Sequence, residues 1–277
     1  MAVCPLCQSS GETRQTHAGY QVKWCRDCDF GFVDPPMPKT EHRTWHNQDF
    51  FVRYYGESIE SFYARKGALY QREVAKKAWM VEQLRRHVPS GRILDIGTGQ
   101  GLFSYTARDA GYDVHATEVC PMDVAYHRSQ GLDVFDGYIE DAHFDGNSFD
   151  AVTMWHTLEH VYDPLGTLTE VCRILKPGGY LVGALPNWRG IGTQARLVLG
   201  HPLFDPATDH ELHFFHYSPR ALKIAFEKSG LKPISIGQEW HRPRRMRDKL
   251  VTWTGNALSV LPGINCRETM TMAALKP

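Results

Sequence analysis

The apolar residues of this chain follow two patterns: one has the spacing of helices, and the other consists of the short runs typical of buried strands. From Ser58 to His87 the apolar residues recur at helical spacing, which predicts one or two helices closed by Pro89-Ser90-Gly91. Beyond residue 91, short apolar runs alternate with helical segments, and this order predicts an α/β fold with a doubly wound sheet. The predicted strands cover residues 93–96, 112–117, 132–135, 150–155, 180–187, 232–237 and 268–277, and the predicted helices cover 102–110, 163–175 and 218–229.

Two of these helices carry end signals in the sequence. The turn KPGG, Lys176 to Gly179, is expected to end helix 163–175, because proline and glycine interrupt a helix. Ser218 is expected to be the N-cap of helix 218–229, with Pro219 at the first helical position.

Four of the seven cysteines form two C-x-x-C pairs near the start of the chain, Cys4 with Cys7 and Cys25 with Cys28. Each pair presents two thiolates from one tight turn, and the 17 residues between the pairs fall in the range of two-knuckle zinc sites. We expect a structural Zn²⁺ site, because four thiolates leave no open position for a substrate. Two unrelated cysteine pairs, or a redox pair, are the alternatives.

Composition narrows the class of protein. Lys and Arg together number 31, as do Asp and Glu, and this balance argues against a general nucleic-acid binder. The sequence contains no run of about 18 apolar residues, so no transmembrane helix is expected. Its first residues show no charged start followed by an apolar core, so a cytoplasmic location is the default expectation.

The segment GRILDIGTGQG, residues 91–101, leads from an apolar run into a predicted helix through closely spaced glycines. Glycines let a ligand approach the backbone, and a helix start offers free N–H groups. The spacing is G-x-G-x-G rather than the G-x-G-x-x-G of dinucleotide sites, and the preceding Asp95 suits the ammonium of an amino-acid-like ligand. Glu118, at the end of the next predicted strand, can accept hydrogen bonds from both hydroxyls of a ribose.

With these features in this order, the chain resembles the class I S-adenosylmethionine (SAM) dependent methyltransferases, and within them the small-molecule branch that includes the ubiquinone-pathway O-methyltransferases. The resemblance covers about residues 89–277 and rests on LDIGTGQG, Glu118, FDAVTMWHTLEHVYDP, ILKPGGYLVGALPN and ELHFFHYSPRAL. It implies a Rossmann-like seven-stranded sheet whose last strand is antiparallel. It also implies that Asp95 and the glycines meet the methionine part of SAM, that Glu118 takes the ribose, and that residues 139–141 lie near the adenine.

The expected domains are a zinc-ribbon-like module over residues 1–38, a helical linker or lid over 39–88, and a methyltransferase domain over 89–277. Insertions into the last domain are expected at 187–215 and 240–265. The residues expected to bind SAM are Asp95, Gly97, Thr98, Gly99, Gly101, Glu118, Val119, Ile139, Glu140 and Trp155.

The run WHTLEH places His156, Glu159 and His160 at helical i, i+3, i+4 spacing, directly after the predicted fourth strand. In the ubiquinone-pathway relatives the comparable run is Glu-Val-Leu-Glu-His, whose acidic and histidine groups hold a divalent cation. Here His156 stands in place of the first Glu, which weakens the case for Mg²⁺, an ion that prefers oxygen ligands. His160 as catalytic base, with His156 next, is one hypothesis, and fastening of the loop to the sheet edge is the other.

His213 is a further candidate base, because DHELHFFHY gathers His210, His213 and His216 in a connection that covers the acceptor in the resembled family. The segment HRPRRMRDK, residues 241–249, holds four arginines and one lysine. A phosphate-bearing acceptor would explain it, because Arg pairs bidentately with phosphate, and a solvated helix face would explain it equally.

These patterns predict methyl transfer from SAM to an oxygen, nitrogen or carbon of a small polar metabolite, such as a sugar, natural-product or cell-envelope precursor. One alternative is a ribosomal-RNA base methyltransferase, because some of those enzymes also join a zinc ribbon to this fold. Another is a non-catalytic module that binds SAM or a partner. The balanced charge favours a small-molecule acceptor over nucleic acid, and no membrane partner is expected.

Overall fold

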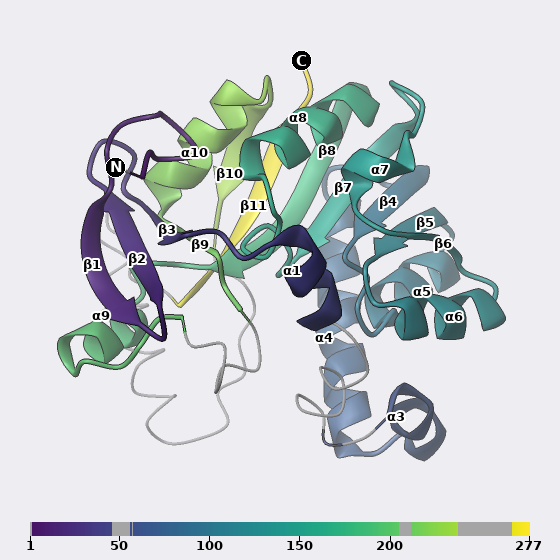
Figure 1. Cartoon of the computed structure of the whole chain (residues 1–277). Coiled ribbons are helices and arrows are strands. Elements are labelled where there is room, and N and C mark those ends of the chain that lie inside the picture. Colours follow the sequence, from purple (N-terminus) through teal and green to yellow (C-terminus); the bar gives the residue numbers. More distant parts are fainter. Residues whose placement is uncertain (1, 46–55, 57, 205–211, 238–267) are drawn as a thin grey trace. The chain divides into compact units, whose positions relative to one another are not determined.

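The computed structural model describes residues 2–45, 56, 58–204, 212–237 and 268–277 (Figure 1). These residues fall into two compact units. The first unit lies within residues 1–36, 156–168 and 183–274, and the second within 37–155, 169–182 and 275–277. Among the helices that the structure describes, none is long and apolar enough to cross a lipid bilayer.

A seven-stranded sheet confirms the predicted doubly wound architecture. Its strand order is β10-β11-β8-β7-β4-β5-β6, and the β4–β5, β4–β7 and β5–β6 pairs are parallel. Its strands are β4 (Arg92–Ile96), β5 (Asp113–Glu118), β6 (Asp133–Asp136), β7 (Phe149–Trp155), β8 (Leu175–Pro186), β10 (Lys232–Ile236) and β11 (Thr269–Leu275).

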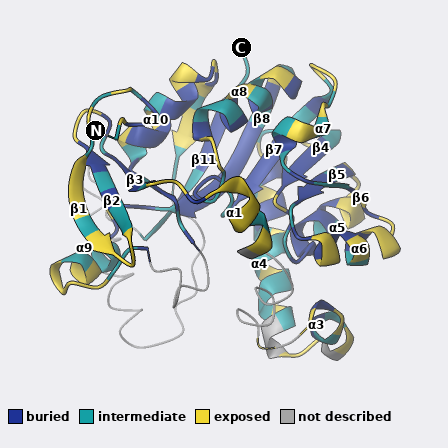
Figure 2. Ribbon diagram, viewed as in Figure 1, coloured by how far each residue is buried: buried dark blue, intermediate teal, exposed yellow. Residues whose placement is uncertain are grey.

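The central strands of this sheet are buried at successive residues rather than at alternate ones. Ile93 and Leu94 of β4 are fully buried, as are Val152 and Met154 of β7. Figure 2 accordingly shows β4, β7 and β8 mainly in dark blue. Burial of successive residues is expected where both faces of a parallel sheet are covered, and it explains why these strands could be located from short apolar runs.

The last strand, β11, runs antiparallel to β10, as the resemblance implies. Gly237, which directly follows β10, and Thr271 exchange both backbone hydrogen bonds, at 2.9 and 3.2 Å. This exchange is the pattern of directly opposed residues in an antiparallel pair.

The helices follow the predicted periodicity, and one cap can be checked directly. The side chain of Ser218 accepts a hydrogen bond from the N–H of Ala221 at 3.1 Å, which confirms Ser218 as the N-cap of α10. The helices are α1 (Lys39–Trp45), α3 (Ile59–Arg65), α4 (Ala68–Arg85), α5 (Leu102–Asp109), α6 (Pro121–Ser129), α7 (Ile139–Ala142), α8 (Pro164–Ile174), α9 (Ile191–Val198) and α10 (Pro219–Lys228).

The KPGG turn differs from its prediction. Helix α8 ends at Ile174, and β8 starts at Leu175, so residues 176–179 belong to the strand rather than to a separating loop. Backbone hydrogen bonds join Gly178 N to Lys276 O and Lys276 N to Gly179 O, each at 2.9 Å. The partner of Gly178 and Gly179 is Lys276, almost a hundred residues further along the chain. The Pro-Gly signal is local, so it could not predict this strand pairing.

A second, four-stranded sheet contains the cysteine-rich segment. Its antiparallel order is β1 (Glu12–His17), β2 (Tyr20–Cys25), β3 (Phe30–Asp34) and β9 (Phe215–Tyr217). Strand β9 pairs with β3 in the register Phe30 to Tyr217 and Phe32 to Phe215. The N-terminal hairpin is therefore completed by a strand from the second half of the chain, which the sequence does not predict.

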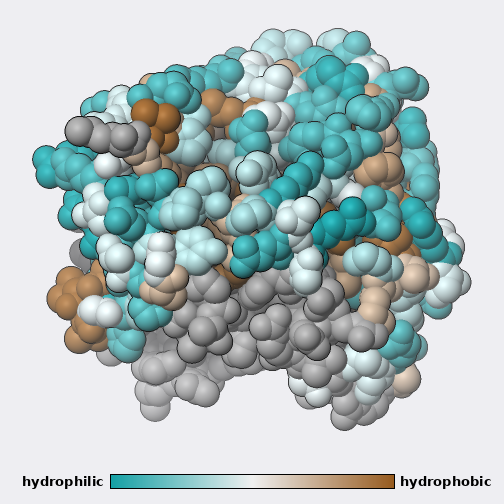
Figure 3. Space-filling model, in the orientation of Figure 1, coloured by the Kyte–Doolittle hydropathy of each residue, from teal (hydrophilic) through white to brown (hydrophobic). Residues whose placement is uncertain are grey.

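Helix α9 contributes no buried side chain to the core. Val198 at its end is 88% exposed, and the following Leu199 is 74% exposed. Hydrophobic surface is visible at the left edge of Figure 3, at the place that Figure 1 gives to α9.

Candidate functional site

The loop between β4 and α5 turns the chain with three left-handed glycines. Gly97, Gly99 and Gly101 have φ of +69°, +52° and +76°, a region that glycine enters without steric penalty. The N–H groups of Gly97 and Thr98 donate to the carbonyl oxygen of Thr117 at 2.9 and 3.1 Å, which ties the loop to the end of β5. Helix α5 then starts directly from Gly101 as its N-cap.

Asp95 is a buried carboxylate just before this loop. One of its oxygens accepts a hydrogen bond from Ser104 Oγ and the other from Thr153 Oγ1, each at 2.8 Å. Burial raises the pKa of Asp95, although the hydroxyls of Ser104 and Thr153 oppose the rise. Two neutral donors do not balance the charge of a buried carboxylate, so a cationic ligand group near Asp95 would stabilise it.

Glu118 is the second buried carboxylate, at the end of β5. Its oxygens accept hydrogen bonds from the N–H groups of Gly99 at 2.8 Å, Val119 at 2.8 Å and Cys120 at 3.0 Å. Burial raises the pKa of Glu118 despite these donors. The neighbouring Asp123 has its pKa raised to about 8, first by burial and then by the charge of Glu118. This end of β5 therefore holds two buried carboxyl groups, Glu118 and Asp123, and is suited to hydroxyl donors or positive charge.

The structure brings the expected SAM-binding residues to one edge of the sheet. Asp95 pairs in register with Ala116 of β5 and with Thr153 of β7, so the carboxyl ends of these parallel strands lie together. Trp155 ends β7, and its ring lies 5.5 Å from that of Phe103 of α5. Ile139 and Glu140 start the short helix α7, which follows β6. Ligands of doubly wound sheets bind at this edge.

Sequence reasoning missed the histidine beneath the glycine loop. His127 of α6 is fully buried; its Nε2–H donates to Gly99 O at 2.8 Å, and its Nδ1 accepts from the hydroxyl of Tyr105 at 2.7 Å. Burial lowers the pKa of His127, so the ring is neutral. Tyr63 of α3 donates its hydroxyl hydrogen to Gln100 O of the same loop. The loop is thus held by two side chains from distant segments.

Helix α1 is attached to the candidate adenine segment by three polar contacts. Lys39 Nζ lies 3.1 Å from Asp141 Oδ2, and Arg43 donates to Asp136 Oδ1 at 2.5 Å. Nδ1 of the buried His42 lies 2.7 Å from the hydroxyl of Tyr138. No local pattern in residues 39–45 indicates these partners, because they lie about a hundred positions further along the chain.

The turn after β7 gathers His156, His160 and His213 around the carboxylate of Glu159, and we call these three the histidine cluster. The Glu159 side chain is 1% exposed, with His156 Nδ1 at 3.6 Å and His160 Nε2 at 4.0 Å from its Oε1. The rings of His160 and His213 lie 4.9 Å apart between centroids. The structure therefore brings the three sequence-predicted histidines together, and it adds a buried acid whose role the sequence left open.

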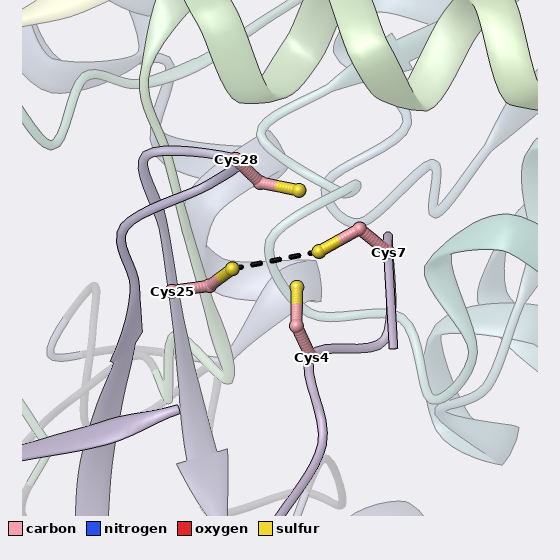
Figure 4. A group of neighbouring side chains, drawn as sticks. All are labelled: Cys4, Cys7, Cys25 and Cys28. Atoms are coloured by element: carbon pink, nitrogen blue, oxygen red, sulfur yellow. Dashed lines mark hydrogen bonds between the residues drawn. The ribbon is translucent and has the colours of Figure 1, made fainter. Parts of the chain in front are cut away.

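The four cysteines of the N-terminal pairs also come together. Their Sγ atoms all lie within 4.8 Å of one another and point inward, as Figure 4 shows. Burial raises the pKa of the Cys4 thiol to about 12 and, with a hydrogen bond to Cys7, raises that of Cys28 as well. The six cysteines that the structure describes form no disulfide. Four sulfurs at this spacing, three of them on buried cysteines, could hold a tetrahedral metal ion.

Several candidate residues lie outside the described part of the chain. They are His210 and the whole of the insertion 240–265, which includes the Arg-rich segment 241–249.

Comparison with known proteins identifies relatives of this chain. The profile of a family described as a methyltransferase domain matches residues 68–236, which is more than half of the chain. A ubiquinone biosynthesis O-methyltransferase of Xanthomonas campestris pv. campestris is 40% identical over 175 residues, covering 58% of this chain and 73% of that protein. A demethylmenaquinone methyltransferase of Renibacterium salmoninarum is 33% identical over 148 residues, covering 53% of this chain. The chain spans 56% of the length of that second relative.

Solved structures support the same fold. A SAM-dependent methyltransferase of Thermotoga maritima superposes with a TM-score of 0.57 at 20% identity, covering 83% of this chain and 99% of that one. A SAM-dependent methyltransferase of Mesorhizobium loti gives 0.51 at 19% identity, covering 70% of this chain and 96% of that one. With the family profile, the glycine loop and the strand order in agreement, the chain belongs to the methyltransferase-domain family of class I SAM-dependent methyltransferases.

Proposed function

We propose that the chain transfers a methyl group from SAM to a small polar acceptor. The observation that carries this proposal is the pair of buried carboxylates, Asp95 and Glu118, beside the glycine loop at one sheet edge. Burial raises the pKa of both, so both gain from a ligand that brings positive charge or hydroxyl donors. SAM brings the ammonium group of its amino-acid part and a ribose diol.

The roles divide according to chemistry. Asp95 and Gly97, Gly99 and Gly101 would meet the methionine part, because the loop allows close backbone approach next to an unbalanced carboxylate. Glu118 would accept the ribose hydroxyls, since three backbone N–H groups already orient its oxygens. The remaining expected contacts to the cofactor are Thr98, Val119, Ile139, Glu140 and Trp155.

When bound, SAM supplies a methyl group on a sulfonium, and its departure leaves a neutral thioether, so no acid is needed to assist the leaving group. A hydroxyl or carbon acceptor must still lose a proton. A member of the histidine cluster would receive it, since His156 and His160 follow within five residues of Trp155, the last residue of β7. His160 is the first residue to test, because its Nδ1 is engaged with Leu212 O at 2.7 Å and its Nε2 can accept. His156 and His213 follow.

We also infer that Cys4, Cys7, Cys25 and Cys28 hold a structural Zn²⁺. Sulfurs at about 2.3 Å from a tetrahedral zinc lie about 3.8 Å apart, and the sulfurs here lie within 4.8 Å of one another. A cation would also replace the protons that the raised pKa values of Cys4 and Cys28 keep on these thiols.

SAM binding tests the cofactor site. Isothermal titration should show that Glu118→Ala weakens SAM binding by at least about tenfold, because a charge-assisted hydrogen bond contributes about 1.5–3 kcal/mol. Asp113→Ala is the matched control, because Asp113 is a carboxylate at the opposite end of the same strand and is exposed. Equal affinity for SAM in the wild type and in Glu118→Ala would refute the ribose assignment.

The acceptor class needs a separate assay. Label from methyl-labelled SAM should enter a small-molecule extract and not ribosomal RNA, and label in the RNA would favour the zinc-ribbon RNA methyltransferases instead. Because relatives of this chain are named for ubiquinone and menaquinone biosynthesis, demethylated quinone precursors are the first pure acceptors to supply.

A further inference from the structure

The N-terminal module, by which we mean residues 2–36, is joined along its last strand to the second half of the chain. Strand β9 pairs with β3 in antiparallel register, with Phe30 opposite Tyr217 and Phe32 opposite Phe215 (Figure 1). The rings of Phe30 and Phe215 stack with centroids 5.7 Å apart, and both residues are buried. The edge that β3 would otherwise offer to a partner is therefore occupied by the same chain.

A side chain of β1 holds a second segment that precedes β9. Gln15 Nε2 donates to the carbonyl oxygen of His201 at 2.8 Å, and Gln15 Oε1 accepts from the N–H of Leu203 at 2.8 Å. The next residue, Phe204, is buried and packs edge-on against Tyr20 of β2, with ring centroids 5.0 Å apart. A carboxamide that bonds both a C=O and an N–H group does what a neighbouring strand would do, so the module fixes this segment by its backbone as well as by packing.

Backbone hydrogen bonds extend this attachment to the histidine cluster. The N–H of Val33 in β3 donates to the carbonyl oxygen of Phe214 at 3.0 Å, and the N–H of Phe214 donates to the carbonyl oxygen of Glu159 at 3.0 Å. Phe214 is thus bonded to the N-terminal module on one side and to the turn after β7 on the other. His213 directly precedes it, and the His213 ring lies 4.9 Å from that of His160. The position of His213 relative to His160 therefore depends on β3.

His160 is bonded to the same segment through its own ring. Its Nδ1 lies 2.7 Å from the carbonyl oxygen of Leu212 and donates to it, because a carbonyl only accepts. Leu212 is fully buried and lies two residues before Phe214. A displacement of residues 212–215 would therefore move the ring of His160 as well as that of His213.

Strands β3 and β9 approach each other closely because residue 31 is a glycine. Gly31 lies opposite His216, and a Cβ added to Gly31 would lie 3.0 Å from Cβ and 3.3 Å from Cδ2 of that histidine. Distances in this range are tighter than nine in ten real contacts of a Cβ atom. A larger residue at position 31 would therefore push β9 away from β3, two residues beyond Phe214.

We propose that the N-terminal module is a supporting wall of the acceptor site and that it positions His160 and His213 for methyl transfer. The inference rests on the proposed function, in which a histidine of this cluster receives the proton of the acceptor. Gly31 and Gln15 are positioning residues, because they act through β9 and through the segment that precedes it. Asp95, Glu118 and the glycine loop take no part in the contacts just described, so the module should govern transfer rather than SAM binding.

Gly31→Val tests this role. Valine favours strands, and Gly31 does not have a positive φ, so the added side chain acts mainly through its contact with His216. At saturating SAM, transfer of label to the small-molecule extract should fall at least about tenfold, because a small displacement of a catalytic group slows the reaction strongly. The Kd for SAM, measured by isothermal titration, should stay within about twofold of the wild-type value. Thr16→Val is the control, because Thr16 is an exposed residue of β1, and this variant should change neither quantity.

Amide hydrogen exchange provides a readout that needs no acceptor. The N–H groups of Phe214 and Phe215 both donate to Glu159 O, and they should exchange at least about tenfold faster in Gly31→Val than in the wild type. Gln15→Met keeps the length of the side chain and removes both amide hydrogen bonds, so it should also slow transfer, and it serves as the second variant if Gly31→Val does not fold.

The number of SAM sites in each titration counts the folded molecules, so transfer per SAM site separates positioning from unfolding. Undiminished transfer per SAM site in Gln15→Met and in any folded Gly31→Val would overturn the inference. Equal losses of SAM affinity and of transfer would overturn it too, because the module would then not act on the acceptor side. Failure of the wild type to bind SAM or to transfer label would overturn the proposed function, and this inference with it.

Discussion

A Cβ atom on Gly101 would lie 2.4 Å from Cε1 of His127, which is closer than any real side-chain contact. The histidine cannot easily move away, because hydrogen bonds to Gly99 O and from Tyr105 hold both of its ring nitrogens. The last glycine of the loop is therefore required by a packed neighbour as well as by its φ of +76°.

Gly101→Ala should destabilise the protein more than Gly111→Ala. Both glycines have positive φ, +76° and +94°, so both alanines meet the left-handed penalty of about 1–2 kcal/mol. Nothing lies within 4 Å of a Cβ on Gly111, whereas Gly101→Ala adds an overpacking penalty of about 1–3 kcal/mol against His127. Urea denaturation of both variants measures the difference. Equal losses of unfolding free energy would show that His127 yields to the new methyl group.

Asp95→Asn should raise the free energy of unfolding at neutral pH while weakening SAM binding. Burial raises the pKa of Asp95 above its ordinary 3.8, so the folded state binds this proton more tightly than the unfolded chain does. Wild-type stability is therefore lost as pH rises from about 3.8 through the raised folded value. The variant should lack that loss, because asparagine does not ionise.

Denaturation of wild type and Asp95→Asn across pH 4 to 8, without SAM, checks this sign. Asp109→Asn, an exposed aspartate in the following helix, is the control and should change neither property. A gap between wild type and Asp95→Asn that shrinks as pH rises would contradict the assignment.

Local signals explain which parts of the fold could be predicted. The structure contains the predicted strands around residues 93–96 and 150–155, the glycine loop and the Ser218 cap. Each of these features depends on interactions within a few residues of the chain. The pairing of β9 with β3 and the Gly178–Lys276 hydrogen bonds join distant segments. Such pairings follow from the folded arrangement and leave no local mark in the sequence.

The candidate site divides in the same way. The positions of Asp95, Glu118 and the cysteines could be predicted from motifs, because strand ends and C-x-x-C turns are defined by residues that are close together in the sequence. The contact of His127 with the glycine loop and the approach of His213 to Glu159 could not, because each joins segments 28 or more positions apart. That these residues bind SAM or zinc stays a prediction.

Cys25→Ser should release the zinc proposed at the cysteines and loosen the N-terminal sheet. Cys25 is fully buried at the end of β2, and about 35 residues cannot bury a self-sufficient core without a metal. Cys172→Ser is the matched control, because Cys172 is a half-buried free cysteine outside the cluster. Elemental zinc analysis and limited proteolysis of residues 1–36 check both variants. Full retention of zinc by Cys25→Ser would remove Cys25 from the ligand set.

Trp188→Ala should cost far more stability than Arg189→Met, although the two residues are adjacent. Trp188 is 6% exposed and stacks on Trp24 of β2 with ring centroids 4.4 Å apart, so its truncation should cost about 3–5 kcal/mol. Arg189 pairs with Asp29, but its side chain is 51% exposed, and exposed ion pairs contribute about 0–1 kcal/mol. Denaturation of both variants, followed by tryptophan fluorescence or near-ultraviolet circular dichroism, measures these costs. Similar costs would mean that the ion pair, rather than the aromatic stack, fastens the N-terminal sheet.

His156→Gly should be more stable than His156→Ala. His156 has a φ of +57°, and its N–H donates to Ala184 O at 2.7 Å, so the turn fixes it in the left-handed region. Alanine keeps the steric penalty of about 1–2 kcal/mol for that region, and glycine removes it. Glycine in turn loses about 0.5–1 kcal/mol of stability, because it has more conformational freedom in the unfolded chain. Both variants lack the imidazole, so a role of His156 in methyl transfer should reduce their turnover equally. Turnover that instead follows the stability difference would assign His156 to shaping the turn after β7, and a glycine variant less stable than the alanine variant would show that residue 156 is not left-handed in solution.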